Sequence, residues 1–124
     1  MVYRYTKAPS QRQLRVSEII KQAISEIFMR NELSLPAFEK IFITVSEVRI
    51  SQDLKIATAF VASISDVDEA ELVKFLNDIA PQIKRVLRKK IELRFTPDVR
   101  FAYDKSFDDG AKIEALLHNT KTHK

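Results

Sequence analysis

Two neighbouring segments in the middle of the chain restrict the fold most strongly, because they have strand-like sequences while their flanks have the period of helices. The first, from Ile41 to about Ile50, is rich in β-branched and aromatic residues. In the second, from Ile56 to Ile64, apolar side chains alternate with a period of two. Ser51-Gln52-Asp53 between them suits a turn. We therefore predict an antiparallel hairpin, whose apolar face another layer must cover.

The segment before the hairpin has the period of a helix. Ser10 is a suitable N-cap for this helix. Apolar side chains then recur three and four residues apart, which predicts a single apolar face. They are Val16, Ile20, Ala23, Ile24 and Ile27. Residues 31–38 contain Asn, Ser and Pro and are predicted to form a loop.

The segment after the hairpin contains a proline that must interrupt a helix. Ser65 or Asp66 is expected to cap this helix, whose apolar stripe runs to Ile79. Pro81 lacks a backbone N–H, and its ring clashes with the preceding turn, so the helix must break or kink near Ala80. A second helix is expected over residues 81–90, because proline is tolerated at a first helical position.

The last part of the chain adds a strand and a helix. A third strand is predicted over Leu93–Phe95 and Val99–Tyr103, interrupted or entered at Pro97, and Ser106 is predicted to cap a short final helix. The order of elements is then helix, strand, strand, helix, kink, helix, strand, helix. It matches the type II KH fold with one extra C-terminal helix. We expect an α+β domain with helices packed on one face of a three-stranded mixed sheet.

The length and composition indicate one small globular unit. The 124 residues, of which 45% are hydrophobic and 31% charged, suffice for a single core. We expect a flexible basic arm over residues 1–9, one KH-like domain over 10–118 and a polar tail over 119–124. The chain has no cysteine, no apolar run like that of a signal peptide, and no stretch near the roughly 18 apolar residues of a membrane span. A cytoplasmic monomer without membrane contact is therefore expected.

The charges are sorted along the chain. The net charge is +4, but six cations face two acids between Met1 and Arg30, and five cations face no acid between Lys84 and Lys90. Between Asp66 and Asp78, five acids accompany one lysine. A chain with this pattern is expected to present a basic face to a polyanion such as RNA.

The helix after Pro81 is the main candidate for RNA binding. At about 100° per residue, Ile83, Val86 and Leu87 share one face of this helix. The opposite face and the helix end carry the predicted RNA-binding residues Lys84, Arg85, Arg88, Lys89 and Lys90. Like charges four residues apart weaken a helix, and a phosphate backbone would offset that cost. The alternative is an ordinary solvated helix face.

The first helix supplies a second set of candidates. Arg12 and Arg15 lie three residues apart and could extend the same RNA-binding surface. The alternative is that the N-terminal cations form a solubilising arm. RNA-binding KH domains have a Gly-x-x-Gly loop between the two central helices, where backbone approaches phosphates closely. The only glycine here is Gly110, so we expect recognition of shape and backbone by side chains, not reading of bases.

Catalysis has little support in the sequence. His118 and His123 lie in or near the polar tail, and the carboxylates have no metal-ligand spacing. No glycine-rich loop could cradle a nucleotide phosphate. We therefore expect no enzyme activity, no metal, no cofactor and no small-molecule substrate. A small hydrolase or nuclease remains only as a weakly motivated alternative.

Several spaced motifs resemble the ribosome-binding factor A family over about 110 positions. They are Arg15-Val16-Ser17-Glu18-Ile19-Ile20, Val48-Arg49-Ile50-Ser51-Gln52-Asp53-Leu54 with Ala57, and Leu93-Arg94-Phe95-Thr96-Pro97 followed by Phe101, Asp104, Ser106, Gly110 and Ile113. One position departs from the family pattern. The family usually has Ala-x-Gly at the kink between the helices, whereas this chain has Ile79-Ala80-Pro81.

The resemblance implies a ribosome biogenesis factor. Such a factor binds the free or immature small (30S) ribosomal subunit, contacts its 16S rRNA near the 5′-terminal helix, and assists late maturation and processing. Two alternatives remain open. The chain could be a protein-interaction module that docks on a ribosomal protein, or a generic RNA-binding KH-like domain.

Overall fold

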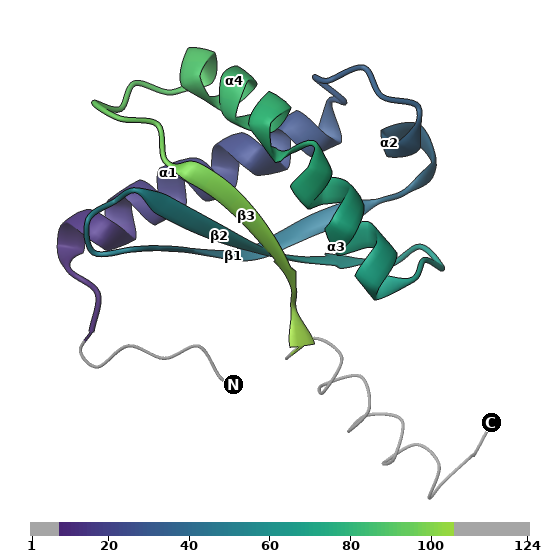
Figure 1. Ribbon diagram of the computed structural model, residues 1–124, viewed down its shortest axis with the longest axis horizontal. Helices are drawn as coiled ribbons and strands as arrows, with labels where there is room; N and C mark the ends of the chain where they lie inside the picture. The colour runs from purple at the N-terminus through teal and green to yellow at the C-terminus, as the bar shows by residue number, and fades with distance from the viewer. Residues whose placement is uncertain (1–7, 106–124) are drawn as a thin grey trace, which may run out of the picture.

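The computed structural model describes residues 8–105 (Figure 1). Its elements are α1 (Gln11–Met29), α2 (Ala37–Lys40), β1 (Ile43–Ile50), β2 (Ile56–Ser63), α3 (Glu69–Asp78), α4 (Ala80–Lys90) and β3 (Asp98–Tyr103). The helix predicted after Ser106, the polar tail at 119–124 and most of the arm at 1–9 lie outside the described residues. The single-domain boundaries therefore stay a prediction.

The three strands form one mixed sheet in the order β1-β2-β3. β1 and β2 pair antiparallel, as the hairpin prediction required, and β2 and β3 pair parallel from Ile56↔Asp98 to Val61↔Tyr103. A parallel pair needs a long crossover, and α3 and α4 supply it. Helices α1, α3 and α4 cover one face of the sheet (Figure 1). The predicted α+β, type II KH-like fold is confirmed.

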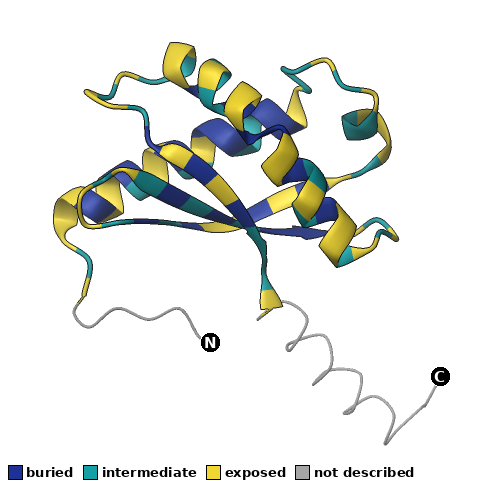
Figure 2. Ribbon diagram, viewed as in Figure 1, coloured by how far each residue is buried: buried dark blue, intermediate teal, exposed yellow. Residues whose placement is uncertain are grey.

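The core lies between this helical layer and the sheet (Figure 2). The buried residues alternate along the strands and recur at helical spacing along α1, because only one face of each element meets the other layer. The largest fully buried aliphatic side chains are Ile20, Ile24, Ile27, Ile50, Val61, Leu76, Ile83 and Leu87.

The start of α1 is fixed by a capping box. The Ser10 hydroxyl accepts from the Gln13 N–H at 3.1 Å, and the Gln13 side-chain oxygen accepts from the Ser10 N–H at 2.9 Å. Ser10 was predicted as the cap. The buried amide of Gln13 also donates to the Ile50 carbonyl at 3.1 Å, which ties the start of α1 to the end of β1.

The break between α3 and α4 lies at Ile79, two residues before Pro81. In a continuous helix the Pro81 ring would clash with the carbonyl of Asn77, and no N–H would be available to bond it. Ile79 takes up the turn with φ −98° and ψ 6°, ends α3 and begins α4. Its N–H donates to the Phe75 carbonyl at 3.1 Å, and its own carbonyl accepts from Ile83 at 3.0 Å. The predicted kink near Ala80 is therefore confirmed.

Three local predictions were wrong. The predicted loop at 31–38 runs only to Pro36, because one helical turn, α2, begins at Ala37. The cap of α3 is Asp68, whose carboxylate accepts from the Glu71 N–H at 3.0 Å, and not Ser65 or Asp66. The Ser65 hydroxyl instead accepts from the Phe42 N–H at 3.0 Å.

The third error concerns the segment Leu93–Phe95, which is not a strand. β3 begins only at Asp98. Its first pair is with Ile56, the first residue of β2, so residues before Asp98 have no neighbouring strand to pair with. The segment forms part of the connection between α4 and β3 instead.

Strand β3 lies at an edge of the sheet, and a side chain from α3 satisfies part of that edge. The Asn77 amide nitrogen donates to the Phe101 carbonyl at 3.1 Å, and its oxygen accepts from the Phe101 N–H at 2.9 Å. Asn77 thus bonds the strand as a neighbouring peptide would, and it holds the end of α3 against β3.

We predict that Asn77→Ala lowers the free energy of unfolding by about 1–3 kcal/mol, because two partly buried backbone groups lose their partner. Urea unfolding measures this change. The control is Gln82→Ala, which removes an amide from an exposed position on α4. Equal stability of the Asn77 variant and the wild type would contradict the role given to this side chain.

Candidate nucleic-acid interface

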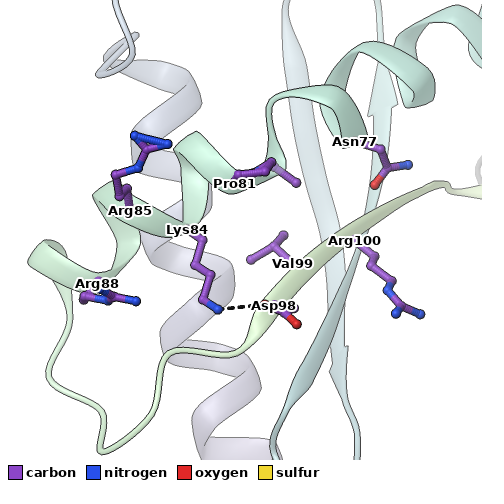
Figure 3. Close-up of a pocket in the computed structure, with 9 residues that line it drawn as sticks. Asn77, Pro81, Lys84, Arg85, Arg88, Asp98, Val99 and Arg100 are labelled. Carbon is purple, nitrogen blue, oxygen red and sulfur yellow. Dashed lines mark hydrogen bonds and ion pairs between the residues drawn. The ribbon is translucent and has the colours of Figure 1, made fainter.

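A groove of about 730 Å³ lies between α4 and the edge of the sheet (Figure 3). The end of α3, residues 80–88 of α4 and the start of β3 form its walls. Its lining residues are Asn77, Ala80, Pro81, Lys84, Arg85, Arg88, Asp98, Val99 and Arg100. Four of these side chains are cationic and one is anionic, so the groove is basic. We call it the α4–β3 groove.

Helix α4 has the two faces that its sequence predicts. Ile83 and Leu87 are buried in the core, and Val86 is partly buried against it. Arg85, Arg88 and Lys89 are exposed, whereas Lys84 and Lys90 are only partly exposed. The last turn carries Arg88, Lys89 and Lys90, where cations are favoured by the negative end of the helix dipole.

Lys84 is already paired within the groove. Its ammonium lies 2.7 Å from an Asp98 carboxylate oxygen, across the gap between α4 and β3 (Figure 3). This hydrogen bond, together with the positive charges of Lys84 and Arg100, holds the pKa of the Asp98 carboxyl below its ordinary value. The pair tethers α4 to β3 and neutralises one of the four groove cations in the free protein.

Lys90 lies in an ion cluster between α4 and α1. Its ammonium is 2.6 Å from Glu26 and 2.9 Å from Glu32. The hydrogen bond from Lys90, and then the charge of Arg30, lower the pKa of Glu26, and the bonds to both carboxylates raise the pKa of Lys90. These partners point to a structural role. The prediction that Lys90 contacts RNA remains untested.

Arg85, Arg88 and Lys89 are the cations of α4 that form no ion pair within residues 8–105. Arg85 and Lys89 stand four residues apart and repel each other slightly. The pairing of Lys84 and Lys90 removes part of the like-charge cost that the sequence implied. The three remaining charges are directed to solvent and are available to an external anion.

Arg100 is a groove residue that the sequence analysis missed. It is exposed on β3 and lines the groove opposite Arg85 and Arg88. Its alternation with the buried Val99 and Phe101 signals an exposed side chain. The sequence did not indicate that Arg100 lies beside α4, because this position depends on the parallel pairing of β2 and β3.

The N-terminal candidates lie elsewhere. Arg12 and Arg15 are exposed on α1, but neither lines the α4–β3 groove. Arg12 lines a separate hollow with Arg94 and Phe95. The idea that these cations extend the same surface therefore stays a prediction.

The kink residues form one end of the groove. Ala80 is buried and Pro81 is exposed, and both line the groove wall. Residues 8–105 contain no glycine at all, so side chains surround the groove where a KH domain of the Gly-x-x-Gly type would offer bare backbone.

The described region holds neither a cluster of metal-ligating side chains nor a helix suited to a membrane. No three His, Cys, Asp or Glu side chains of residues 8–105 are grouped as metal ligands would be. Among the described helices, none is both long and apolar enough to cross a lipid bilayer.

The sequence matches known proteins over most of its length. The family model described as "Ribosome-binding factor A" matches residues 12–117. The chain is 44% identical, over 120 residues, to the ribosome-binding factor A of Pelagibacter ubique (strain HTCC1062), and the match covers 97% of this chain and 98% of the relative.

Solved structures share the fold. The crystal structure of ribosome-binding factor A from Thermus thermophilus matches with a TM-score of 0.61 and 20% identity, over 73% of this chain and 94% of that chain. A homology model of the Thermus thermophilus factor was fitted into a cryo-electron microscopy map of a 30S complex. It matches with a TM-score of 0.56 and 22% identity, and the match covers 70% of this chain and 89% of that chain.

The Lys90 cluster predicts a pH dependence. A lowered pKa of Glu26 means that its contribution to stability is present above the ordinary value of 4.5 and is lost as pH falls through the lower, folded value. The raised pKa of Lys90 means that its contribution is present below 10.5 and is lost as pH rises through the higher, folded value.

We therefore expect Lys90→Met to lower the free energy of unfolding at neutral pH and to have a shrinking effect as the pH falls below 4.5. Urea unfolding at several pH values measures this difference. Lys89→Met is the control, since Lys89 is exposed and has no ion-pair partner in the described part of the chain. A difference that is independent of pH would contradict the account.

Proposed function

The chain belongs to the ribosome-binding factor A family, and from this premise we propose that it binds the free or immature small ribosomal subunit. There it contacts 16S rRNA near the 5′-terminal helix and assists late maturation and processing. It acts in the cytoplasm as a monomer that binds and does not catalyse, and it needs no cofactor.

The α4–β3 groove is the observation that carries this proposal. Arg85, Arg88 and Arg100 line the groove of about 730 Å³, and the first two have no ion pair in the described residues. A guanidinium presents a planar set of donors that fits phosphate oxygens in a bidentate manner. Lys89 continues the cationic surface toward the end of α4.

The groove favours contacts to phosphate and sugar over the reading of bases. Four long cationic side chains line it, and at the kink its lining residues are Ala80 and Pro81, where a Gly-x-x-Gly loop would offer bare backbone. Phosphate contacts supply affinity that is independent of sequence and depends strongly on salt. Selection of the small subunit would then come from the shape of its RNA and from further contacts.

The Lys84–Asp98 pair can take part in binding. A phosphate that enters the groove competes with the Asp98 carboxylate for the Lys84 ammonium. The Lys84 side chain is 30% exposed and that of Asp98 is 67% exposed, so water weakens the pair and exchange for a phosphate costs little. In the RNA complex, Lys84 would bind a phosphate. In the free protein, Lys84 pairs with Asp98 and holds α4 to β3.

One observation favours a second candidate function, docking on a protein. An apolar hollow of about 260 Å³ lies between α1, α2 and β1 and is lined by Phe28, Met29, Phe38 and Phe42 among others. Met29 and Phe42 are 75% and 55% exposed. A ribosomal protein that docked there would give binding with little salt dependence, unlike RNA contact through the groove.

We predict that Arg85→Gln with Arg88→Gln weakens binding to free small subunits and leaves the thermal midpoint unchanged. Two lost phosphate contacts should make the slope of log K against log salt less steep by roughly 1.4–1.8. Co-sedimentation with purified subunits at several salt concentrations measures both quantities.

The control for this variant is Arg30→Gln with Lys40→Gln, which removes the same charge near α2, away from the groove lining. It should bind as the wild type does. If both double variants lose affinity equally, net charge explains the binding and the groove does not. If neither loses affinity, the RNA-binding proposal fails.

A further inference from the structure

The connection between α4 and β3 presents a large aromatic side chain to solvent. Phe95 is 75% exposed, although Pro97, two residues later, is fully buried. Single exposed apolar residues are common and need no explanation on their own. Phe95 differs because it borders a hollow with a defined lining.

This hollow has an apolar floor and a cationic rim. It measures about 120 Å³ and is lined by Arg12, Val16, Leu54, Leu93, Arg94 and Phe95. The aliphatic residues pack against the core below it. A drug-sized ligand or a cofactor needs roughly 300–1,000 Å³, so the hollow suits one flat ring that remains partly outside. We call it the Phe95 hollow.

Two hydrogen bonds hold the parts of the hollow together. The Gln13 side-chain amide donates to the Ile50 carbonyl, which ties the start of α1 to the residue before the turn that contains Leu54. The Asp98 N–H donates to the Lys55 carbonyl at 2.9 Å, which fixes the other end of the loop to the same turn. The site therefore exists before any ligand arrives, and binding has little ordering cost.

The charges around the hollow fit an anionic partner. Neither Arg12 nor Arg94 forms an ion pair within the described residues. Arg15 adds a third exposed cation on α1. The carboxylates close in sequence are the exposed Glu18 on α1 and Glu92 on the loop, and Asp53, which accepts from the Ser51 hydroxyl and the Lys55 N–H.

We infer that the Phe95 hollow binds one unpaired nucleobase of RNA, which stacks on the Phe95 ring while Arg12 and Arg94 bind its flanking phosphates. Aromatic rings stack on any base, because every base has a π-face. This inference rests on the proposed function and adds to it a place where a single-stranded nucleotide is gripped. The α4–β3 groove would hold backbone, and the hollow would require that one base be unpaired.

The test measures binding of wild type and variants to a single-stranded RNA oligonucleotide that contains 2-aminopurine, and to free small subunits. Loss of one stacked base should weaken oligonucleotide binding of Phe95→Ala by roughly 5- to 150-fold. Phe95→Tyr keeps the ring and should bind as the wild type does. The control is Ile64→Ala, which removes an apolar side chain that is 74% exposed just after β2 and lies outside the lining of the Phe95 hollow.

A stacked 2-aminopurine is quenched, so its fluorescence should fall when wild type binds and should stay high with Phe95→Ala. A fully paired duplex should show no dependence on Phe95. If Phe95→Ala binds RNA and subunits as tightly as wild type while Arg85→Gln with Arg88→Gln binds weakly, the inference is overturned and the proposed function stands.

Two other outcomes would also overturn the inference. If Phe95→Ala loses affinity for subunits but not for RNA, Phe95 contacts a ribosomal protein. If wild type binds neither RNA nor small subunits, the proposed function fails together with the inference.

Discussion

The break at Ile79 determines where the charges of this molecule lie. Pro81 cannot continue the helix that begins at Glu69, so the crossover from β2 to β3 is made of two helices that meet at an angle. Both can then bury an apolar stripe, Leu72 and Leu76 from α3 and Ile83 and Leu87 from α4. The outward face of α4 is thereby placed beside the edge of β3, and the groove follows from that placement.

The cations of α4 fall into two groups, those paired with carboxylates of neighbouring elements and those without an ion pair in the described residues, and the sequence alone does not separate the groups. Lys84 and Lys90 connect α4 to Asp98 of β3 and to Glu26 and Glu32 of the α1 side. The Lys84–Asp98 pair, with Asp98 67% exposed, contributes little stability, whereas Lys90 and Glu32 are less exposed, at 20% and 22%. Arg85, Arg88 and Lys89 have no such partners among the described residues, which makes them the cations free to bind phosphate.

Most of the fold could be predicted because the periods of the apolar residues and a single proline determine it locally. The helix from Ser10, the hairpin and the break before Pro81 all follow from residues close in sequence. The errors arose where contacts between residues distant in sequence determine the local structure. The Ser65 hydroxyl accepts from the Phe42 N–H and does not cap α3, and Leu93–Phe95 has no strand to pair with.

The site was less predictable than the fold for the same reason. Helical geometry alone identified the exposed cations of α4. Arg100 joins them because β3 pairs parallel to β2. Arg12 lines one hollow with Arg94 and Phe95 because α1 packs beside the connection between α4 and β3, a placement that the bond from Gln13 to Ile50 supports. A sequence pattern does not show which residues of distant elements are neighbours in the fold. The alternation of apolar and polar residues along β3 does show which of its side chains are exposed.

The absence of cysteine from the chain allows one direct measurement of the central claim, that the α4–β3 groove faces small-subunit RNA. A photo-crosslinker attached to Gln82→Cys, exposed on α4 between Pro81 and Lys84, is compared with one attached to Glu39→Cys, exposed on α2. Each labelled protein is bound to free small subunits and irradiated. The account predicts crosslinks to 16S rRNA from position 82 and few or none from position 39. Crosslinks to RNA from position 39 alone, or to ribosomal protein alone from position 82, would contradict it.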